Sequence, residues 1–273
     1  MRKAILVIFL LVVGAATLAP AQTLFAPRYE FASSPHFIAP DQPKIDLPGT
    51  PLPRLAPELA LHLLMQQNAQ QAERLAEYTD DTLIQAELPD TSQKGEYELV
   101  RNYNAQPRSL SYRSVKFTGD SFVKTNVITR LLQSEVDHVQ KADPASSALT
   151  EANYKFNYKG TEEIDGKLMH VYQLKPRRKD PSLFKGRIFI DAHTGTLRRA
   201  EGTVAKSPSF FIRKIEFVQT FSDIDGFTVP VEMRSTAKAR IIGKAIVSIF
   251  HRGYQLKAHP SPAATSAFLQ SCK

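Results

Sequence analysis

The sequence predicts an α+β fold in which a curved antiparallel sheet is capped by amphipathic helices. From about Tyr97 onward, short segments rich in aromatic and β-branched residues follow a two-residue hydrophobic period. Turn dipeptides at Asp165-Gly166, Thr194-Gly195 and Asp225-Gly226 separate these segments into long hairpins. Two further stretches have the hydrophobic period of a helix, one before these segments and one among them. This order is typical of an antiparallel meander and not of alternating strand-helix-strand units.

The N-terminus has the pattern of a secretory signal peptide. Arg2 and Lys3 precede an apolar run from Ala4 to Ala16, and Ala19-Pro20-Ala21 is a small-x-small cleavage site. We therefore expect residues 1–21 to be a signal peptide that is cut after Ala21. The alternative is an uncleaved membrane anchor, which the shortness of the apolar run disfavours.

A proline-rich arm and a first helix follow. Nine of the 18 prolines fall between Pro20 and Pro57, and proline fits neither a helix interior nor a central strand. Residues 22–54 are therefore predicted to be an extended arm or linker. From Pro57, which suits a first helical turn, apolar residues recur at spacings of three and four. These residues are Leu61, Leu64, Met65, Ala72, Leu75 and Ala76.

A second helix is expected in "NVITRLLQSEVDHVQK", with Asn126 as its N-cap. Ile128, Leu131, Leu132 and Val139 share one face of it. At the other end of the chain, residues 258–273 are predicted to be a flexible tail. The single cysteine, Cys272, cannot form a disulfide within the chain, and a bond between two chains stays open.

The predicted strands carry apolar residues on both faces. An antiparallel sheet with one solvated face alternates cleanly between apolar and polar residues, and several of these strands do not. The second apolar face must therefore meet a helix, a second layer or a ligand. An apolar cavity between sheet and helices is one reading, and an ordinary filled core is the other. The candidate cavity-lining residues are Phe156, Tyr158, Tyr172, Phe217 and Phe221.

The chain is basic, with a net charge of +8. Export argues against nucleic acid as a partner and favours anionic lipid headgroups. The segment "KPRRKDPSLFKGR" is predicted to contact an anionic membrane surface, or else to be a plain solvated loop. Its cationic residues are Lys175, Arg177, Arg178, Lys179, Lys185 and Arg187.

Catalytic signatures are absent from the sequence. Asp191 and His193 stand two residues apart, but we interpret them as a turn in which Asp191 accepts backbone N–H bonds and His193 lies at an exposed tip. No nucleophile elbow, metalloprotease motif or nucleotide-binding loop is found, and the histidines lack ligand-like spacing. No catalytic residue, metal or cofactor is predicted.

Two segments resemble the lipoprotein-localisation (LolA/LolB-like) superfamily. They are "YKGTEEIDGKLMHVYQLKPR" and "FKGRIFIDAHTGTLRRAEG", each a strand-turn-strand unit. The resemblance implies an unclosed antiparallel β-barrel, or half-barrel, over residues 55–257. It also implies a periplasmic location, a cavity for acyl chains of lipids or lipoproteins, and no catalysis.

Three functions follow as hypotheses. The leading one is a non-catalytic periplasmic protein that binds acyl chains or a lipoprotein in an apolar half-barrel cavity, with a role in outer-membrane lipoprotein sorting. The second is an envelope-stress sensor that binds another envelope protein. The third, an envelope hydrolase, requires a carboxylate and a nucleophile beside His170 or His251.

Overall fold

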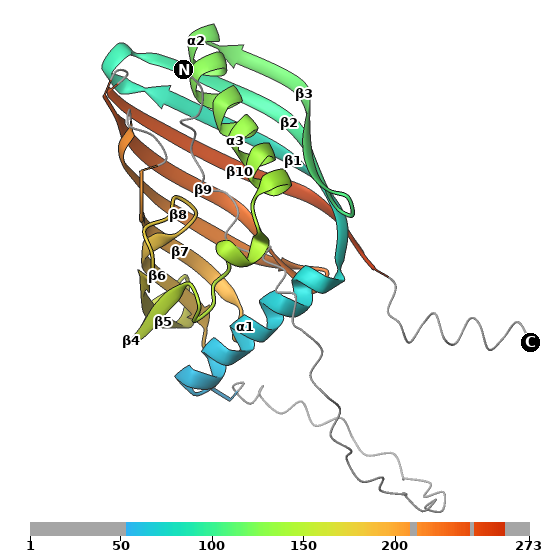
Figure 1. The fold of residues 1–273 in the computed structure, drawn as a ribbon, viewed down its shortest axis with the longest axis vertical. Coiled ribbons are helices and arrows are strands. Elements are labelled where there is room, and N and C mark those ends of the chain that lie inside the picture. The colour runs from blue at the N-terminus through green and yellow to red at the C-terminus, as the bar shows by residue number, and fades with distance from the viewer. Residues whose placement is uncertain (1–52, 208–211, 241–242, 260–273) are drawn as a thin grey trace, which may run out of the picture.

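Ten antiparallel strands form one sheet, which confirms the predicted fold class (Figure 1). The computed structural model describes residues 53–207, 212–240 and 243–259. The predicted signal peptide, residues 22–52 of the arm, Cys272 and the rest of the tail after His259 lie outside these residues. The strands are β1 Leu75–Leu88, β2 Gln93–Ala105, β3 Arg108–Gly119, β4 Tyr154–Ile164, β5 Lys167–Pro176, β6 Phe184–Asp191, β7 Leu197–Val204, β8 Ile212–Ile224, β9 Phe227–Ala239 and β10 Gly243–Ala258.

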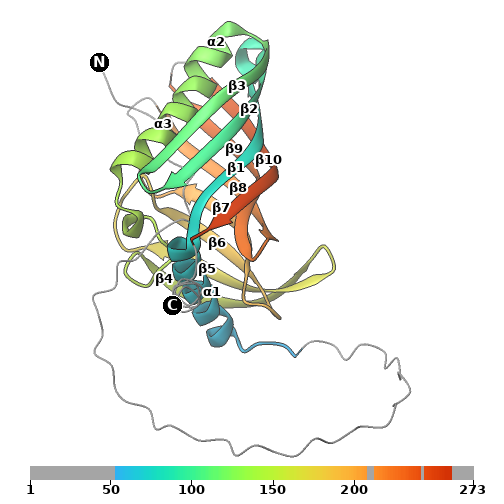
Figure 2. The same ribbon diagram turned by 90° about the vertical axis from the view of Figure 1, so that its right-hand side faces the viewer.

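The sheet is open because its two edge strands do not pair with each other. The strand order is β3-β2-β1-β10-β9-β8-β7-β6-β5-β4, and β1 pairs with β10 to join the N-terminal strands to the rest. The sheet twists and curves strongly between these edges, as the two perpendicular views show (Figures 1 and 2). An unclosed half-barrel is therefore the architecture of the described residues.

Close backbone contact between two strands accompanies this curvature. Gly186 in β6 is the cross-strand partner of Gly202 in β7. A Cβ atom added to Gly186 would lie 1.8 Å from the carbonyl oxygen of Glu201 and 2.7 Å from the Cα of Gly202. Only glycine therefore fits at residue 186.

Two helical segments pack against the sheet. The helix α1, Pro57–Arg74, runs along the ends of the strands (Figure 1). The segments α2, Ser121–Val123, and α3, Thr129–Lys141, are joined by a π-helical turn at Lys124–Ile128. Short 3₁₀ turns occur at Pro89–Thr91 and Pro144–Ser146.

The first helix is shorter than predicted. It begins at Pro57 as expected but ends at Arg74, so Leu75 and Ala76 belong to β1 and not to the helix. Strand β1 was not predicted, because its first residues continue the helical spacing of the segment before it. The buried residues of α1 are Ala60, Leu64 and Gln71.

The second helix starts earlier than predicted. Helical structure begins at Ser121, and Asn126 lies inside it, where its side-chain Nδ2 donates to the carbonyl oxygen of Phe122. The prediction of Asn126 as N-cap was therefore wrong. The predicted apolar face was right, since Ile128, Leu131, Leu132 and Val139 are all buried.

The predicted turns are confirmed. Asp165 and Gly166 have φ values of 50° and 71°, and Asp225 and Gly226 have 51° and 77°. Two consecutive positive φ values are the signature of the type I′ turn that suits a two-residue hairpin.

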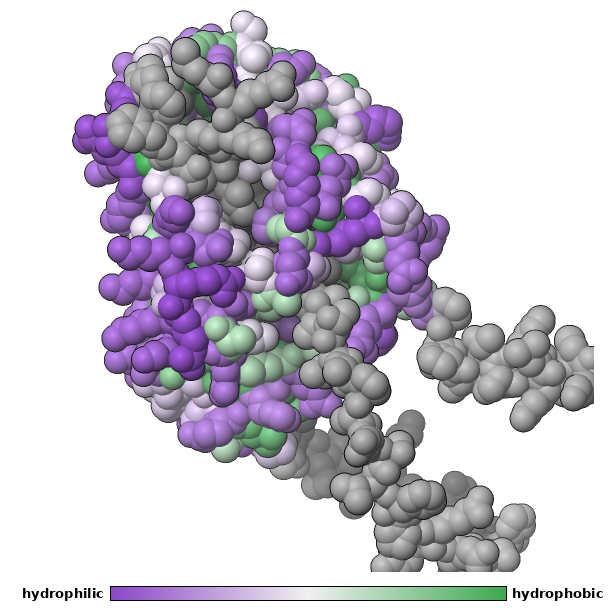
Figure 3. All heavy atoms as spheres, in the orientation of Figure 1, coloured by the Kyte–Doolittle hydropathy of each residue, from purple (hydrophilic) through white to green (hydrophobic). Residues whose placement is uncertain are grey.

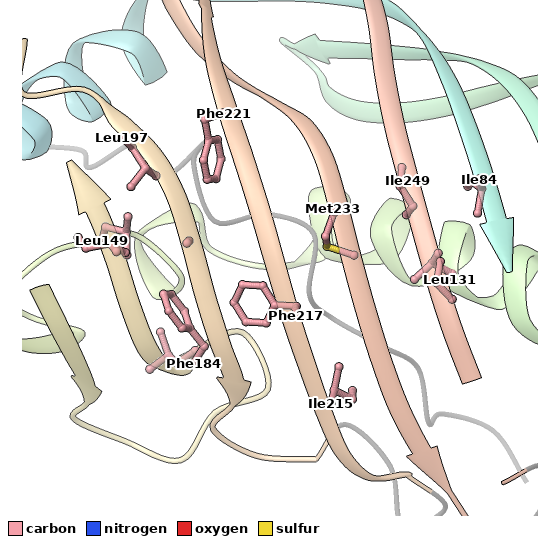
Figure 4. Packing of buried hydrophobic residues seen from close by; sticks show 14 of the residues in the cluster. Ile84, Leu131, Leu149, Phe184, Leu197, Ile215, Phe217, Phe221, Met233 and Ile249 are labelled. Atoms are coloured by element: carbon pink, nitrogen blue, oxygen red, sulfur yellow. The ribbon is translucent and has the colours of Figure 1, made fainter. Parts of the chain in front are cut away.

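The main core lies on one face of the sheet, which we call the inner face. Buried apolar side chains from the central strands share this face with Leu131 of α3 and Leu149 of the loop before β4 (Figure 4). On the side of the molecule in Figure 3, hydrophilic side chains predominate among the described residues. Within the described part of the chain, no helix has the length and hydrophobicity needed to cross a membrane.

Candidate functional site

A continuous row of side chains crosses the inner face from one edge of the sheet to the other. Each member is the cross-strand partner of the next in the antiparallel register, so the row includes one residue from every strand. From β3 to β4 it reads Phe117, Tyr97, Ile84, Ile249, Met233, Gln219, Ala200, Ile188, Tyr172 and Tyr158. Every member except Gln219 has an aliphatic, aromatic or thioether side chain. Apart from Gln219, this row of the inner face is therefore apolar across the full width of the sheet.

A neighbouring row carries unusually small residues. Phe217 of β8 pairs with Ser235 of β9 on one side and with Gly202 of β7 on the other, and Gly202 pairs with Gly186. The Phe217 ring meets the Phe184 ring edge-on at 5.2 Å between centroids. Gly202 and Gly186 add no side chain to this row, and Phe217 and Phe184 are both buried.

The five predicted cavity-lining residues all lie on the inner-face side of their strands, but at different depths. Phe217, Phe221 and Tyr172 are buried, and Phe156 is half-buried and packs against the same cluster. Tyr158 is 41% exposed on the edge strand β4. Four of the five therefore join one apolar cluster, and Tyr158 marks its rim.

The helices contact mainly the outer strands. Among the described residues, α1 contacts β6, and the helical segments from Ser121 to Lys141 contact β1, β2 and β3. Helix α1 also reaches the start of β9, where Gln71 bonds the backbone of Thr228, and β7 and β8 have no comparable helix partner there. The apolar centre of the sheet therefore lies between the two helical segments.

A buried polar network, which the sequence patterns did not predict, lies beneath α3. Arg101 of β2 donates from Nε to Asp80 Oδ2 at 2.7 Å and from a terminal nitrogen to the Tyr254 hydroxyl at 2.8 Å. A second terminal nitrogen lies 3.5 Å from Glu135 Oε1, and Tyr112 donates to Glu135 Oε2 at 2.5 Å. The network therefore joins β1, β2, β3 and β10 to the helix.

Burial and mutual contacts set the charge states of this network. Burial lowers the pKa of His251 to about 4, and the positive charge of Arg101 acts in the same direction. Burial would raise the pKa of Asp80, but Arg101, His251 and Thr82 together hold that pKa below its usual value. Burial raises the pKa of Glu135 despite its ion pair with Arg101. At neutral pH, His251 is therefore uncharged and Asp80 is ionised.

The geometry around His251 differs from that of a hydrolytic triad. Its Nδ1 lies 3.0 Å from Asp80 Oδ1 and 2.9 Å from Thr82 Oγ1, and Thr82 itself donates to Asp80 at 2.7 Å. A triad needs the carboxylate and the nucleophile on opposite ring nitrogens. Here both face the same nitrogen, and all three residues are buried. The cluster supports the sheet, and the hydrolase hypothesis loses its candidate at His251.

His170 has no carboxylate partner in its hydrogen bonds. Its Nε2 lies 3.0 Å from the carbonyl oxygen of Leu55, which only accepts, so Nε2 carries the proton. Its Nδ1 lies 3.2 Å from the Tyr158 hydroxyl. His170 therefore fastens the segment before α1 to β5. Among the described residues, no group of three His, Cys, Asp or Glu side chains could hold a metal ion.

The turn interpretation of Asp191 is confirmed. Its Oδ1 accepts from the backbone N–H groups of His193 and Thr194, and Gly195 has a φ of 73°. The prediction of an exposed His193 was wrong, because His193 is half-buried. Helix α1 packs on this turn: a Cβ on Gly195 would lie 2.9 Å from Leu63 Cβ.

The basic segment divides into two groups. Arg177 donates to the carbonyl of Glu151, Arg178 to Asn153, and Arg187 to Glu201. The lysines of the same segment, Lys175, Lys179 and Lys185, are exposed. The arginines thus hold the fold together locally, and the lysines remain directed to solvent.

A sequence signal for the polar network did exist. Asp80 and Thr82 share a strand face with Ile84 and Ala86, and Arg101 shares one with Leu99. When a charged residue takes a core-facing position in a strand, its side chain is expected to be buried. Buried charges are paired, so these two positions indicate partners for each other.

Comparison with known proteins gives matches of low identity. A family model described as a family of unknown function (DUF5686) matches residues 144–255. No curated protein matches the chain. A DUF1329 family protein from Desulfovibrio piger is 12% identical with a TM-score of 0.41, over 76% of this chain and 95% of that one.

Two further solved structures are similar to the chain. The LolA superfamily protein NE2245 from Nitrosomonas europaea is 12% identical with a TM-score of 0.37, over 78% of this chain and 99% of that one. A putative outer membrane lipoprotein-sorting protein domain from Vibrio parahaemolyticus has the same identity and coverage and a TM-score of 0.40. Structures of the LolA superfamily and of a lipoprotein-sorting domain are thus among those that this chain resembles.

Proposed function

We propose that this chain is a non-catalytic periplasmic protein that binds acyl chains of a lipid or lipoprotein against the inner face of its sheet. The single observation that carries the proposal is the row of apolar side chains across the open sheet, from Phe117 to Tyr158. Two edge strands leave this face unclosed, and its centre lies between the helical segments. A role in outer-membrane lipoprotein sorting follows from this binding.

The chemistry of the surface fits a flexible hydrocarbon. Transfer of an acyl chain from water is favourable by about 0.8 kcal/mol for each buried methylene. Phe217 and Phe221 from β8 project from the same side of their strand, toward Phe184 and Leu197 respectively (Figure 4).

The exposed lysines extend the proposal to the membrane. Lys175, Lys179 and Lys185 lie on one loop and its flanking strands, and Leu183 and Phe184 of the same segment are buried. Three solvated cations attract an anionic leaflet, each worth about 1 kcal/mol near the surface. We place the membrane contact on these three lysines, because the arginines of the segment are occupied by internal bonds.

Native mass spectrometry of the full chain purified from bacterial envelopes tests the function. We expect bound lipid on the wild type and its loss in Phe217→Asp, because a carboxylate at this buried position of the inner face cannot be solvated. Val218→Asp is the matched control, since Val218 stands on the opposite face of the same strand. Phe217→Ala serves as a second variant if Phe217→Asp fails to fold.

Two outcomes reject acyl binding. Lipid retained unchanged by a folded Phe217→Asp protein excludes the inner face as the site. A stoichiometric protein partner without lipid supports the alternative of an envelope sensor.

A further inference from the structure

One polar side chain occupies the centre of the apolar row. Gln219 stands in β8 with Met233 of β9 and Ala200 of β7 as its cross-strand partners. In β8, Ile215, Phe217 and Phe221 are the other buried members of the same face. Gln219 is only 2% exposed. A glutamine therefore takes a position whose two cross-strand partners and nearest same-face residues in β8 are all apolar.

The amide oxygen of Gln219 is left unpaired. Its Oε1 is buried and has no hydrogen-bond partner among the residues that the structure describes. The other buried glutamine, Gln71, behaves differently: its Nε2 donates to the carbonyl of Thr228, and its Oε1 accepts from the N–H of Thr228. A buried acceptor without a donor costs about 1–3 kcal/mol relative to a paired one. A leucine at residue 219 would avoid that cost, so the amide is unfavourable for the fold alone.

We propose that Gln219 recognises a hydrogen-bond donor carried by the acyl ligand, either the N–H of an amide-linked acyl chain or a hydroxyl on the chain. The inference deepens the acyl-binding function and rests on it. A donor is required because the orphaned atom is an acceptor. A plain ester or an unsubstituted hydrocarbon chain has no such donor and leaves Oε1 unpaired. The sheet thus selects among lipids by a polar group inside the hydrocarbon region.

Matched probe pairs test the selection. N-propyl hexadecanamide differs from propyl hexadecanoate in one N–H, and methyl 2-hydroxyhexadecanoate differs from methyl hexadecanoate in one hydroxyl. With delipidated full chain, we expect the donor-bearing member of at least one pair to bind about tenfold more tightly. The pair that shows the difference identifies which donor is recognised.

Two variants test whether the preference depends on Gln219 itself or on any polar side chain of the inner face. In Gln219→Leu, the preference should vanish while the donor-free probe binds as well as before or better. Ser235→Ala, at the next buried polar position in β9, should keep the preference. Gln219→Leu should also raise the melting temperature, since it removes an unpaired amide. Gln219→Met, which is unbranched, replaces it if leucine does not fit.

The outcomes distinguish the two proposals. If wild type binds neither member of either pair, acyl binding itself fails and this inference fails with it. If all probes bind equally and Gln219→Leu changes nothing, acyl binding stands and the role of Gln219 is wrong. Loss of the preference in Ser235→Ala with its retention in Gln219→Leu also overturns the assignment.

Discussion

Arg101 of β2 and Glu135 of α3 form a buried ion pair, with 3.5 Å between a guanidinium nitrogen and Oε1. Arg101 is also the partner of Asp80, so one cation faces two carboxylates. The Arg101 guanidinium further lies 5.0 Å from the centre of the Tyr78 ring. The helix is therefore fastened to the sheet by charge as well as by its apolar face.

Removal of the cation should destabilise the fold strongly. Arg101→Met leaves the buried side chains of Asp80 and Glu135 without their cationic partner. We expect a loss of about 3–5 kcal/mol in the free energy of unfolding, measured with denaturant. Arg113→Met, at an exposed position of β3, should stay within about 0.5 kcal/mol of wild type. A similar loss in both variants would contradict the role of the network.

Stability should depend on pH through His251. The folded state keeps His251 neutral down to about pH 4, whereas the unfolded chain protonates it near pH 6.5. The unfolded state therefore binds more protons in this window, and stability falls as the pH falls from 6.5 to 4. The His251 contribution is about 3 kcal/mol.

Comparison of variants isolates this contribution. The raised pKa of Glu135 has the opposite effect, because it lowers the stability as the pH rises above the pKa that Glu135 has in the unfolded chain. The lowered pKa of Asp80 affects the stability only below about pH 3.8. Urea melts of His251→Asn at a series of pH values should show a flatter profile than wild type. His62→Asn, exposed on α1, should reproduce the wild-type profile.

Gln71 should fix α1 to the β8–β9 turn. Its amide forms both hydrogen bonds with the backbone of Thr228, at 2.9 and 2.8 Å. Gln71→Leu leaves the partly buried N–H and carbonyl of Thr228 unpaired, and we expect a loss of about 1–3 kcal/mol by thermal or urea unfolding. Gln70→Leu, on the exposed side of the same helix, should change stability little. Equal stability of the two variants would show that the turn needs no such anchor.

Gly186→Ala should prevent normal strand pairing. The added methyl group would overlap the backbone of β7 at Glu201. We expect loss of the folded protein, or a destabilisation above about 3 kcal/mol. Gly166→Asn is the control, because a Cβ there meets nothing within 4 Å and asparagine tolerates a positive φ. Circular dichroism and thermal melts of both variants decide the matter.

Local patterns predicted the hairpins and the face of α3 but not the polar network. The Asp-Gly turns require positive φ at both residues, and that requirement is visible in the dipeptide itself. The apolar face of α3 follows from Ile128, Leu131, Leu132 and Val139. Both features depend on short stretches of chain.

The missed features depend on distant contacts. Leu75 continues a helical spacing, yet pairing with Ala258 of β10 makes it a strand residue. His193 looks like an exposed tip until α1 packs on its turn. Arg101, Asp80 and Glu135 come together only when β1, β2 and α3 meet. The orphaned amide of Gln219 becomes visible only once its neighbours in β7 and β9 are known.

The two open margins of the sheet differ in charge. Strand β3 exposes Arg113 and Lys116 and has no acidic residue, whereas β4 exposes Lys155 and Lys159 together with Glu162 and Glu163. When two molecules approach each other at their β3 margins, cations oppose cations, and strand addition between copies at β3 is disfavoured. Added salt weakens this repulsion, so the colloidal behaviour of the protein depends on ionic strength even though its interior does not.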